Sequence, residues 1–169
     1  MAVVEKFLGQ RVSVPNALHY ISKPGLWANS NEEYIIFGLT EPALVLAGGF
    51  NDLDWLVPNG QTVSKGEAVI FCITAKILYI DAPITGIIHF NESAKQNTSI
   101  IVDDPYGNGW MFKIKSKQPV EEAFCQFVSA DDYIQSLKET DGHKNPDGLI
   151  GGVSGICKAV YSGIREQKF

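Results

Sequence analysis

Turn signals at short, regular intervals divide the first 116 residues of this chain. The turns are marked by Pro, Gly and Asn, and the segments between them are rich in β-branched and aromatic residues, which favour strands. Seven strands are expected in this part of the chain, at residues 26–28, 34–39, 50–56, 67–75, 77–82, 87–90 and 110–115. Short strands separated by such turns are typical of a β-barrel or a β-sandwich. The pattern therefore predicts a mainly β fold.

One short helix is expected among these strands. Thr40 is placed to cap it, Pro42 falls in its first turn and Gly48 lies beyond its end, which are positions that these residue types prefer. Loops are expected at residues 12–18, which contain Pro and Asn, and at residues 91–99, which are polar.

The C-terminal part of the chain has the pattern of helices. Short helices are expected at residues 120–127 and 130–138, the second of them capped by Ser129. Residues 139–149 are polar and contain Gly and Pro, as linkers do. Residues 150–169 carry apolar side chains at helical spacing opposite a face of small residues, which predicts an amphipathic helix. This helix could pack on its own barrel or on a partner.

The composition excludes several classes of function. The chain has 169 residues, 45 % of them apolar and 20 % charged, as in an ordinary globular protein with one main domain. Its net charge of −5 argues against nucleic acid or an anionic membrane as the main partner. No apolar run reaches the roughly 18 residues of a membrane span, and the N-terminus has neither signal-peptide nor transit-peptide character.

The reactive side chains do not form a catalytic pattern. The three cysteines are far apart and make neither a disulfide framework nor a zinc motif, so a cytoplasmic protein with reduced thiols is expected. The histidines are scattered, and no nucleophile elbow or metal-ligand spacing occurs, so we do not expect an enzyme. The residues concerned are Cys72, Cys125, Cys157, His19, His89 and His143.

A single lysine stands between two strongly β-forming segments. Lys76 separates residues 67–75 from residues 77–82, and it is the only lysine or arginine between positions 67 and 90. One primary amine at the turn of an apolar hairpin is what a covalently attached swinging-arm cofactor needs. A solvated lysine that keeps the hairpin soluble fits the same pattern.

Several motifs resemble one known family. Residues 104–115 read D-P-Y-G-N-G-W-M-F-K-I-K, residues 83–86 read P-I-T-G, and residues 38–43 read G-L-T-E-P-A, with Trp27 upstream. In order and spacing these motifs resemble those of the glycine cleavage system H protein family, whose members are lipoyl carriers. The resemblance covers roughly residues 15–138.

The resemblance implies a fold, a cofactor site and partners. The fold would be a lipoyl-type barrel-sandwich hybrid with short peripheral helices, comprising residues 1–138, with residues 150–169 as a C-terminal helical extension. Lys76 falls at the position that the family lipoylates, where the lysine amine forms an amide with lipoic acid. The implied partners are proteins, namely lipoate-dependent enzymes such as the glycine cleavage components or their analogues, and neither nucleic acid nor a membrane.

The chain departs from the family around this site. Ile73 stands where the family has the glutamate that lipoate-attaching enzymes read, and the return strand after Lys76 is one residue short, which moves the lysine off the apex by one. Family residues that line the cleft sheltering the loaded arm are replaced by Gly25, Leu26 and Pro42. A second hypothesis is therefore an unmodified adaptor that kept the fold and binds protein partners.

Other residues near Lys76 have two interpretations each. Cys72, four residues before the lysine, could exchange with a dithiolane thiol or be a structural thiol in a buried strand. Asp52 and Asp54 could form an acidic rim for a basic partner enzyme or a solvated strand face. The three tryptophans, Trp27, Trp55 and Trp110, are expected in the core or at the barrel rim.

Overall fold

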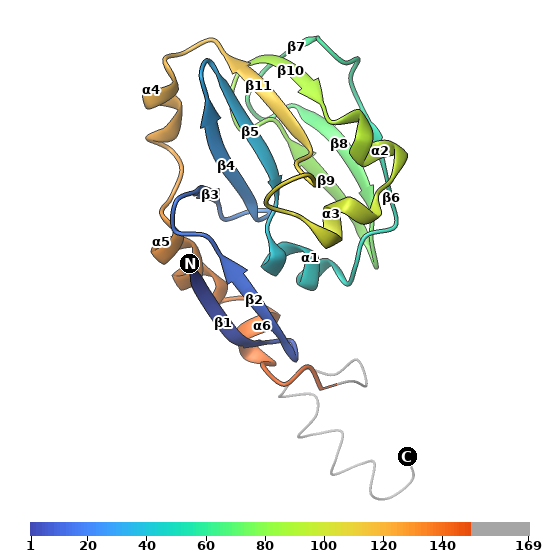
Figure 1. Ribbon diagram of the computed structural model, residues 1–169, viewed down its shortest axis with the longest axis vertical. Helices are drawn as coiled ribbons and strands as arrows, with labels where there is room; N and C mark the ends of the chain where they lie inside the picture. Colours follow the sequence, from blue (N-terminus) through green and yellow to red (C-terminus); the bar gives the residue numbers. More distant parts are fainter. Residues whose placement is uncertain (150–169) are drawn as a thin grey trace, which may run out of the picture.

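The body of the protein is a sandwich of two antiparallel sheets, shown in Figure 1. The computed structural model describes residues 1–149. The larger sheet has six strands in the order β3-β4-β5-β11-β10-β7, and the smaller has three in the order β6-β8-β9. The N-terminal strands β1 and β2 form a separate hairpin beside the body. The expectation of a mainly β fold with short peripheral helices is thus confirmed, while the helix predicted for residues 150–169 lies outside the described residues.

The elements are short, as the turn spacing predicts. The strands are β1 (Ala2–Phe7), β2 (Gln10–Val14), β3 (His19–Ile21), β4 (Leu26–Asn31), β5 (Tyr34–Leu39), β6 (Asp52–Trp55), β7 (Thr62–Val63), β8 (Ala68–Ile73), β9 (Ile77–Asp81), β10 (Gly86–Phe90) and β11 (Phe112–Ser116). The helices are α1 (Glu41–Ala47), α2 (Glu92–Gln96), α3 (Ser99–Asp103), α4 (Val120–Phe124), α5 (Ala130–Leu137) and α6 (Asp141–Lys144).

The main core fills the space between the two sheets. Alternate residues of the central strands point into it, so that in β5 Ile35 and Phe37 are fully buried while Tyr34 and Ile36 are only half-buried. The same alternation in β8 and β9 contributes buried side chains from the smaller sheet, among them Ile70, Cys72 and Ile80. Burial of these apolar side chains is the main force that holds the two sheets together.

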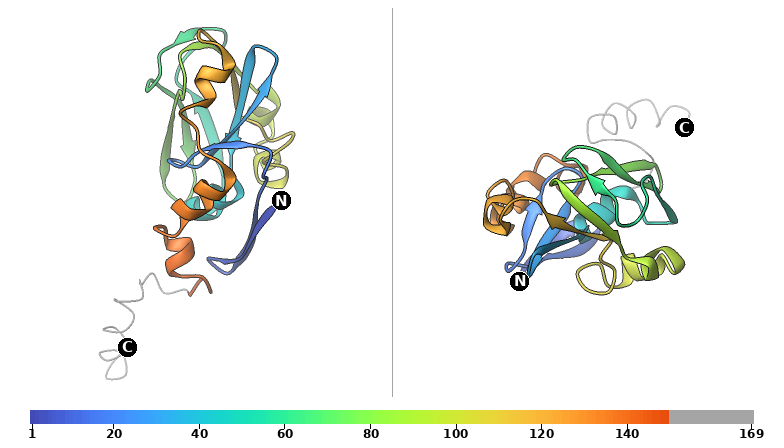
Figure 2. Two further views of the ribbon diagram at one scale, coloured as in Figure 1. Left: turned by 90° about the vertical axis from the view of Figure 1, so that its left-hand side faces the viewer. Right: turned by 90° about the horizontal axis from the view of Figure 1, so that it is seen from above.

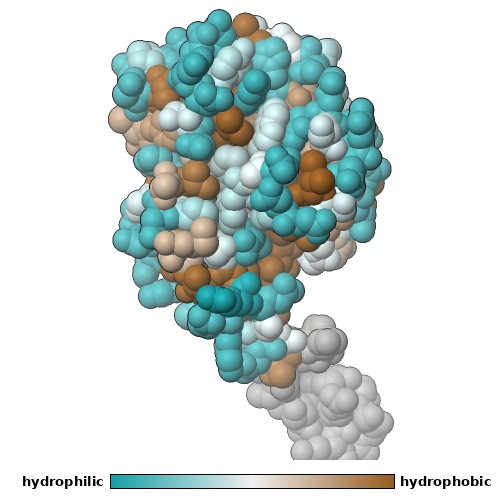
Figure 3. Space-filling view, in the orientation of Figure 1, coloured by the Kyte–Doolittle hydropathy of each residue, from teal (hydrophilic) through white to brown (hydrophobic). Residues whose placement is uncertain are grey.

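A second, smaller core joins the N-terminal hairpin to the body. Its buried residues are Phe7, Val12, Val14, Tyr20, Trp27, Ala130, Tyr133 and Leu137. Helix α6 packs on the hairpin, because Gly142 lies against the Phe7 ring with no room for a side chain. Residues 139–149, predicted to be a linker, therefore contain a helix that contacts β1. Figure 2 shows the hairpin and helices α5 and α6 extending from one end of the sandwich, and in Figure 3 hydrophobic atoms gather where they join it.

Two loop predictions are wrong in part. Residues 12–14 belong to β2, which pairs with β1 across a turn at Leu8 and Gly9. This hairpin buries Val12 and Val14 only because α1 and α5 cover it, and that contact joins segments remote in the sequence. Residues 91–99 contain α2, where a five-residue helix buries Ala94 alone and so shows no apolar periodicity.

Helix α1 has the caps that its sequence predicts. The Thr40 hydroxyl accepts a hydrogen bond from the Ala43 backbone N–H at 3.1 Å, and Gly48 ends the helix in the left-handed conformation at φ 75°. The Thr40 hydroxyl also lies 2.6 Å from the Tyr133 hydroxyl of α5, in a buried pair. Thr40 therefore both starts α1 and connects it to the C-terminal helices.

We expect Thr40→Val to lower the free energy of unfolding by about 2 kcal/mol, because it removes a cap worth about 1 kcal/mol and leaves the buried Tyr133 hydroxyl without its partner. The matched control is Thr98→Val, at the start of α3, where the side chain makes no capping bond. Urea unfolding followed by circular dichroism measures both variants. Equal losses in the two would contradict a special role for Thr40.

Candidate functional site

Lys76 lies in the turn between β8 and β9. Ile73, the last residue of β8, pairs directly with Ile77, the first residue of β9, so the turn consists of residues 74–76. Ala75 is at its centre, and Lys76 follows as its last residue. The lysine is thus one residue past the centre of the turn, and its side chain is exposed.

Hydrogen bonds fix the conformation of this turn. Thr74 is buried, and its hydroxyl accepts a bond from the Lys76 N–H at 3.1 Å and donates one to the Lys76 carbonyl at 2.6 Å. The Ala75 N–H donates to the carbonyl of Ala47, at the end of α1, at 3.0 Å. The backbone that carries Lys76 is therefore bonded both within the turn and to the neighbouring helix.

A β-bulge interrupts the pairing of β8 with β9. Ala68 pairs with Asp81, but Ile70 pairs with Ile80, so Val69 is an extra residue in β8. Val69 and Ile70 are both fully buried, as expected where two residues oppose one. Beyond the bulge the register is regular up to the turn. The irregularity thus lies about seven positions before Lys76, by the count of the sequence, and the pairing next to the turn is regular.

Apolar side chains on the outer face of the smaller sheet lie on the two strands that lead into and out of the lysine's turn. Ile73 is 41 % exposed, Ile77 62 % and Tyr79 56 %. Phe71 completes the group, and its ring packs against the edge of Tyr79 with centroids 5.3 Å apart. Within residues 1–149 the Lys76 ammonium makes no ion pair. The amine is accessible on a fixed support.

The three positions that replace the family's cleft residues are buried. Leu26 is 1 % exposed, and Pro42 is buried in the first turn of α1. At Gly25 a side chain would lie 2.8 Å from the Ala43 methyl group, so α1 packs directly on this glycine. These residues belong to packed regions and present no polar group to the surface.

The residues that carry the family resemblance hold loops together. The buried Trp27 ring donates from Nε1 to the Pro105 carbonyl at 2.8 Å, so its predicted place in the core is confirmed. The Tyr106 hydroxyl donates to the Ser13 carbonyl at 2.5 Å and accepts from the Glu41 N–H at 3.0 Å. Burial raises the pKa of Tyr106, which keeps its hydroxyl protonated as a donor. These contacts are structural.

Cys72 faces the core, away from the surface that carries Lys76. It is fully buried, and burial raises the pKa of its thiol to about 12. A thiol in this state is not a nucleophile at neutral pH. The interpretation of Cys72 as a structural residue is confirmed, while Cys125 is exposed.

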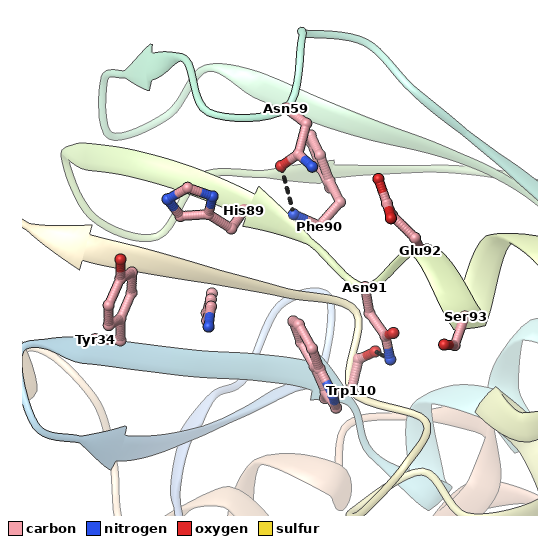
Figure 4. Close-up of a pocket in the computed structure, with 9 residues that line it drawn as sticks. Tyr34, Asn59, His89, Phe90, Asn91, Glu92, Ser93 and Trp110 are labelled. Atoms are coloured by element: carbon pink, nitrogen blue, oxygen red, sulfur yellow. Dashed lines mark hydrogen bonds between the residues drawn. The ribbon is translucent and has the colours of Figure 1, made fainter.

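A groove of about 450 Å³ lies on the larger sheet and is shown in Figure 4. Two of its polar side chains are bonded to the backbone: Asn59 accepts a bond from the Phe90 N–H, and the Asn91 amide donates to the carbonyls of Asn108 and Trp110. The rings of Tyr34 and His89 meet edge to face at one end of the groove. Asn59 and Asn91 therefore stabilise the loops around the groove.

The described residues offer neither a metal site nor a membrane-spanning helix. Among residues 1–149 no cluster of three or more His, Cys, Asp or Glu side chains could hold a metal ion. No helix in this part of the chain is both long and apolar enough to span a membrane.

The sequence pattern located Lys76 but not the contacts that hold its turn in place. The bulge at Val69 and the bond from Ala75 to Ala47 have no local signal, because each depends on residues far apart in the chain. The exposed apolar face has a signal in the sequence. Its outward residues, Phe71, Ile73, Ile77 and Tyr79, are as apolar as the inward residues that alternate with them.

Comparisons with known proteins agree on one family. The family model described as Glycine cleavage H-protein matches residues 18–140. A protein named "Probable glycine cleavage system H protein 2" from Saccharolobus solfataricus is 33 % identical over 75 % of this chain and 86 % of its own length. The "Glycine cleavage system H protein" of Cronobacter sakazakii is 34 % identical over 70 % of this chain and 92 % of its own.

A solved structure has the same fold. It is the crystal structure of a glycine cleavage system H protein from Mycobacterium marinum, with a TM-score of 0.61 and 24 % identity. The similarity covers 72 % of this chain and 97 % of the other.

We expect Gly48→Ala to lower the free energy of unfolding by about 1–2 kcal/mol, because its φ of 75° is unfavourable for alanine and the new methyl group would lie 2.7 Å from the Ala75 methyl. Gly66→Ala is the matched control, since Gly66 also has a positive φ but open space around it. Adding Ala75→Gly to Gly48→Ala relieves the contact and should recover the excess loss over the control. Urea titrations of all variants measure this, and no excess would contradict the packing of the turn on α1.

We expect alkylation with iodoacetamide at pH 8 to modify Cys125 quickly and Cys72 only after unfolding. A pKa of about 12 leaves about one Cys72 thiolate in ten thousand at this pH, and burial blocks the reagent as well. Peptide mapping by mass spectrometry distinguishes the cysteines. Rapid labelling of Cys72 in the folded protein would show that its strand opens.

Proposed function

This chain belongs to the glycine cleavage H-protein family, and on that premise we propose that it carries lipoate in amide linkage on Lys76 and presents it to partner enzymes. H proteins are lipoyl carriers that work between the enzymes of glycine cleavage. The chain itself acts as a carrier and not as an enzyme. We place it in the cytoplasm, where thiols such as those of Cys72 and Cys125 stay reduced.

The observation that carries this proposal is the turn at Lys76. A residue that receives a cofactor from one enzyme and presents it to others must be accessible, and the lysine is exposed at the end of a hairpin. Its backbone must also hold still while its side chain moves, and the bonds from Thr74 and Ala47 provide that support. The three-residue turn fits a lysine that is modified.

The residues of the chain have separate tasks in this function. The Lys76 Nζ provides the amine for the amide bond to the carboxyl group of lipoate. Bound lipoate supplies a dithiolane that carries the transferred group, which is aminomethyl in glycine cleavage. Cys72 stays out of this chemistry because its protonated thiol is buried on the other face of β8.

The buried positions beside α1 favour a second candidate within the same class. Leu26 and Pro42 are packed and apolar, so they give a loaded arm no hydrogen-bonding group there. An aminomethyl amine gains from such groups, whereas a less polar cargo does not. Another lipoate-dependent transfer, served by enzymes analogous to those of glycine cleavage, is the alternative carrier function.

Intact mass measurement of the protein purified from its native host tests the proposal. We expect an increment of about 188 Da, from the mass of lipoic acid less water, and peptide mapping of residues 66–95 should place it on Lys76. Lys76→Arg keeps the charge but cannot form the amide under these conditions, so it should show the unmodified mass and no carrier activity.

The same mass measurement can also contradict the proposal. An unmodified Lys76, in cells whose other lipoyl proteins are modified, would contradict the carrier function. The adaptor hypothesis would then account for the exposed apolar residues around the turn. Assay of glycine cleavage with the modified protein separates the two carrier functions, because only a glycine cleavage carrier supports release of carbon dioxide from glycine.

A further inference from the structure

The surface around Lys76 has an unusual composition for an exposed sheet face. Two neighbouring cross-strand pairs, Phe71 with Tyr79 and Ile73 with Ile77, place four apolar side chains side by side. Three of the four are more than a third exposed. An apolar group of this kind on a protein surface marks an interaction site more often than a solvated strand does.

Carboxylates border this apolar group. Strand β6 lies next to β8, with Asp52 opposite Ile73 and Asp54 opposite Phe71, and both acids are exposed. On the other strand Asp81 follows Tyr79 on the same face and is also exposed. Lys76 stands in the adjoining turn, and Lys95 is bonded to Asp54 at 2.6 Å. The amide at Lys76 would remove one of these positive charges.

From this arrangement, and resting on the proposed function, we propose that the outer face of the smaller sheet is the docking surface for the enzyme that attaches lipoate to Lys76. We further assign to that enzyme an apolar contact surface bordered by lysine or arginine side chains. Ile73 and Ile77 then provide the recognition that the family obtains from a glutamate at the position of Ile73.

Geometry makes contact with this face unavoidable. Ile73 and Ile77 are the paired residues that flank the turn, so an active site that encloses the Lys76 ammonium also covers them. A basic surface that approached here without apolar groups would bury Ile77 against charge, which is unfavourable. An apolar centre with a basic border satisfies both the isoleucines and the carboxylates.

The charges argue against a second copy of this chain as the occupant. Two copies packed through this face would bring Asp52, Asp54 and Asp81 close to the same carboxylates of the partner, and like charges at an interface cost free energy. Four apolar side chains are also a small centre compared with the roughly 800 Å² that each partner buries in a stable complex. A transient contact with an enzyme that modifies the lysine and then leaves fits this size.

The test measures binding apart from modification. The full chain with Lys76→Arg is titrated with the lipoate-attaching enzyme of the same organism in a calorimeter. We expect Ile77→Ser with Tyr79→Ser to weaken binding at least tenfold, and Asp81→Lys to weaken it about fivefold. Binding should also weaken as salt is raised, since the border is charged.

Matched variants on other surfaces serve as controls. Ile87→Ser changes an isoleucine that is 37 % exposed on β10 of the larger sheet, and Asp103→Lys reverses an exposed acid at the end of α3. Neither should change the binding by more than about twofold. Circular dichroism and thermal unfolding confirm that all variants fold.

Three results would overturn the docking proposal: absence of binding by the Lys76→Arg chain, equal losses in test and control variants, or a dimer in sedimentation that Ile77→Ser dissociates. The last would assign the face to a second copy. Mass measurement of the chain with native Lys76 after incubation with the enzyme and a lipoyl donor reports on the proposed function separately. A chain that is modified, but equally well with Ile77→Ser and Tyr79→Ser, is a carrier with a different docking surface.

Discussion

Helix α1 is attached at both ends, and the two halves of the structure meet on it. At its start the Thr40 hydroxyl caps the helix and meets the Tyr133 hydroxyl of α5. At its end Ala47 accepts the hydrogen bond of the Ala75 N–H from the turn that carries Lys76. Between these points Ala43 and Leu44 belong to the main core, while Val45 and Leu46 pack on the second core. A seven-residue helix has little stability of its own, so these contacts keep it in place, and it in turn holds the turn.

The function of such a carrier requires rigidity below the lysine and freedom above it. The bonds around Thr74 hold the backbone, and the exposed Lys76 side chain is not engaged in an ion pair with the described residues. A held backbone and a free side chain agree with the proposed transport of a group between enzymes. The proposed docking surface for the lipoate-attaching enzyme lies beside this turn, on Ile73 and Ile77.

Several elements were predictable because interactions between residues close in the sequence determine them. The caps of α1 and α5, at Thr40 and Ser129, follow from residue types that satisfy free backbone donors within three positions. The N-terminal hairpin and the bulge at Val69 were not predictable in this way. The hairpin is stable only against Gly142 and its neighbours, and the bulge shows only when two strands are paired, so neither has a signal within one segment of sequence.

The residue pattern alone was sufficient to recognise a mainly β fold and a lysine between two β-forming segments, because strands, turns and caps depend on neighbouring residues. It was also sufficient to recognise the family from motifs such as residues 104–115. Only the packed chain established that Leu26 and Pro42 are buried while Ile73 and Ile77 are exposed. Burial is a property of the surroundings of a residue, and apolar side chains like these have the same sequence signature in a core and on a docking surface.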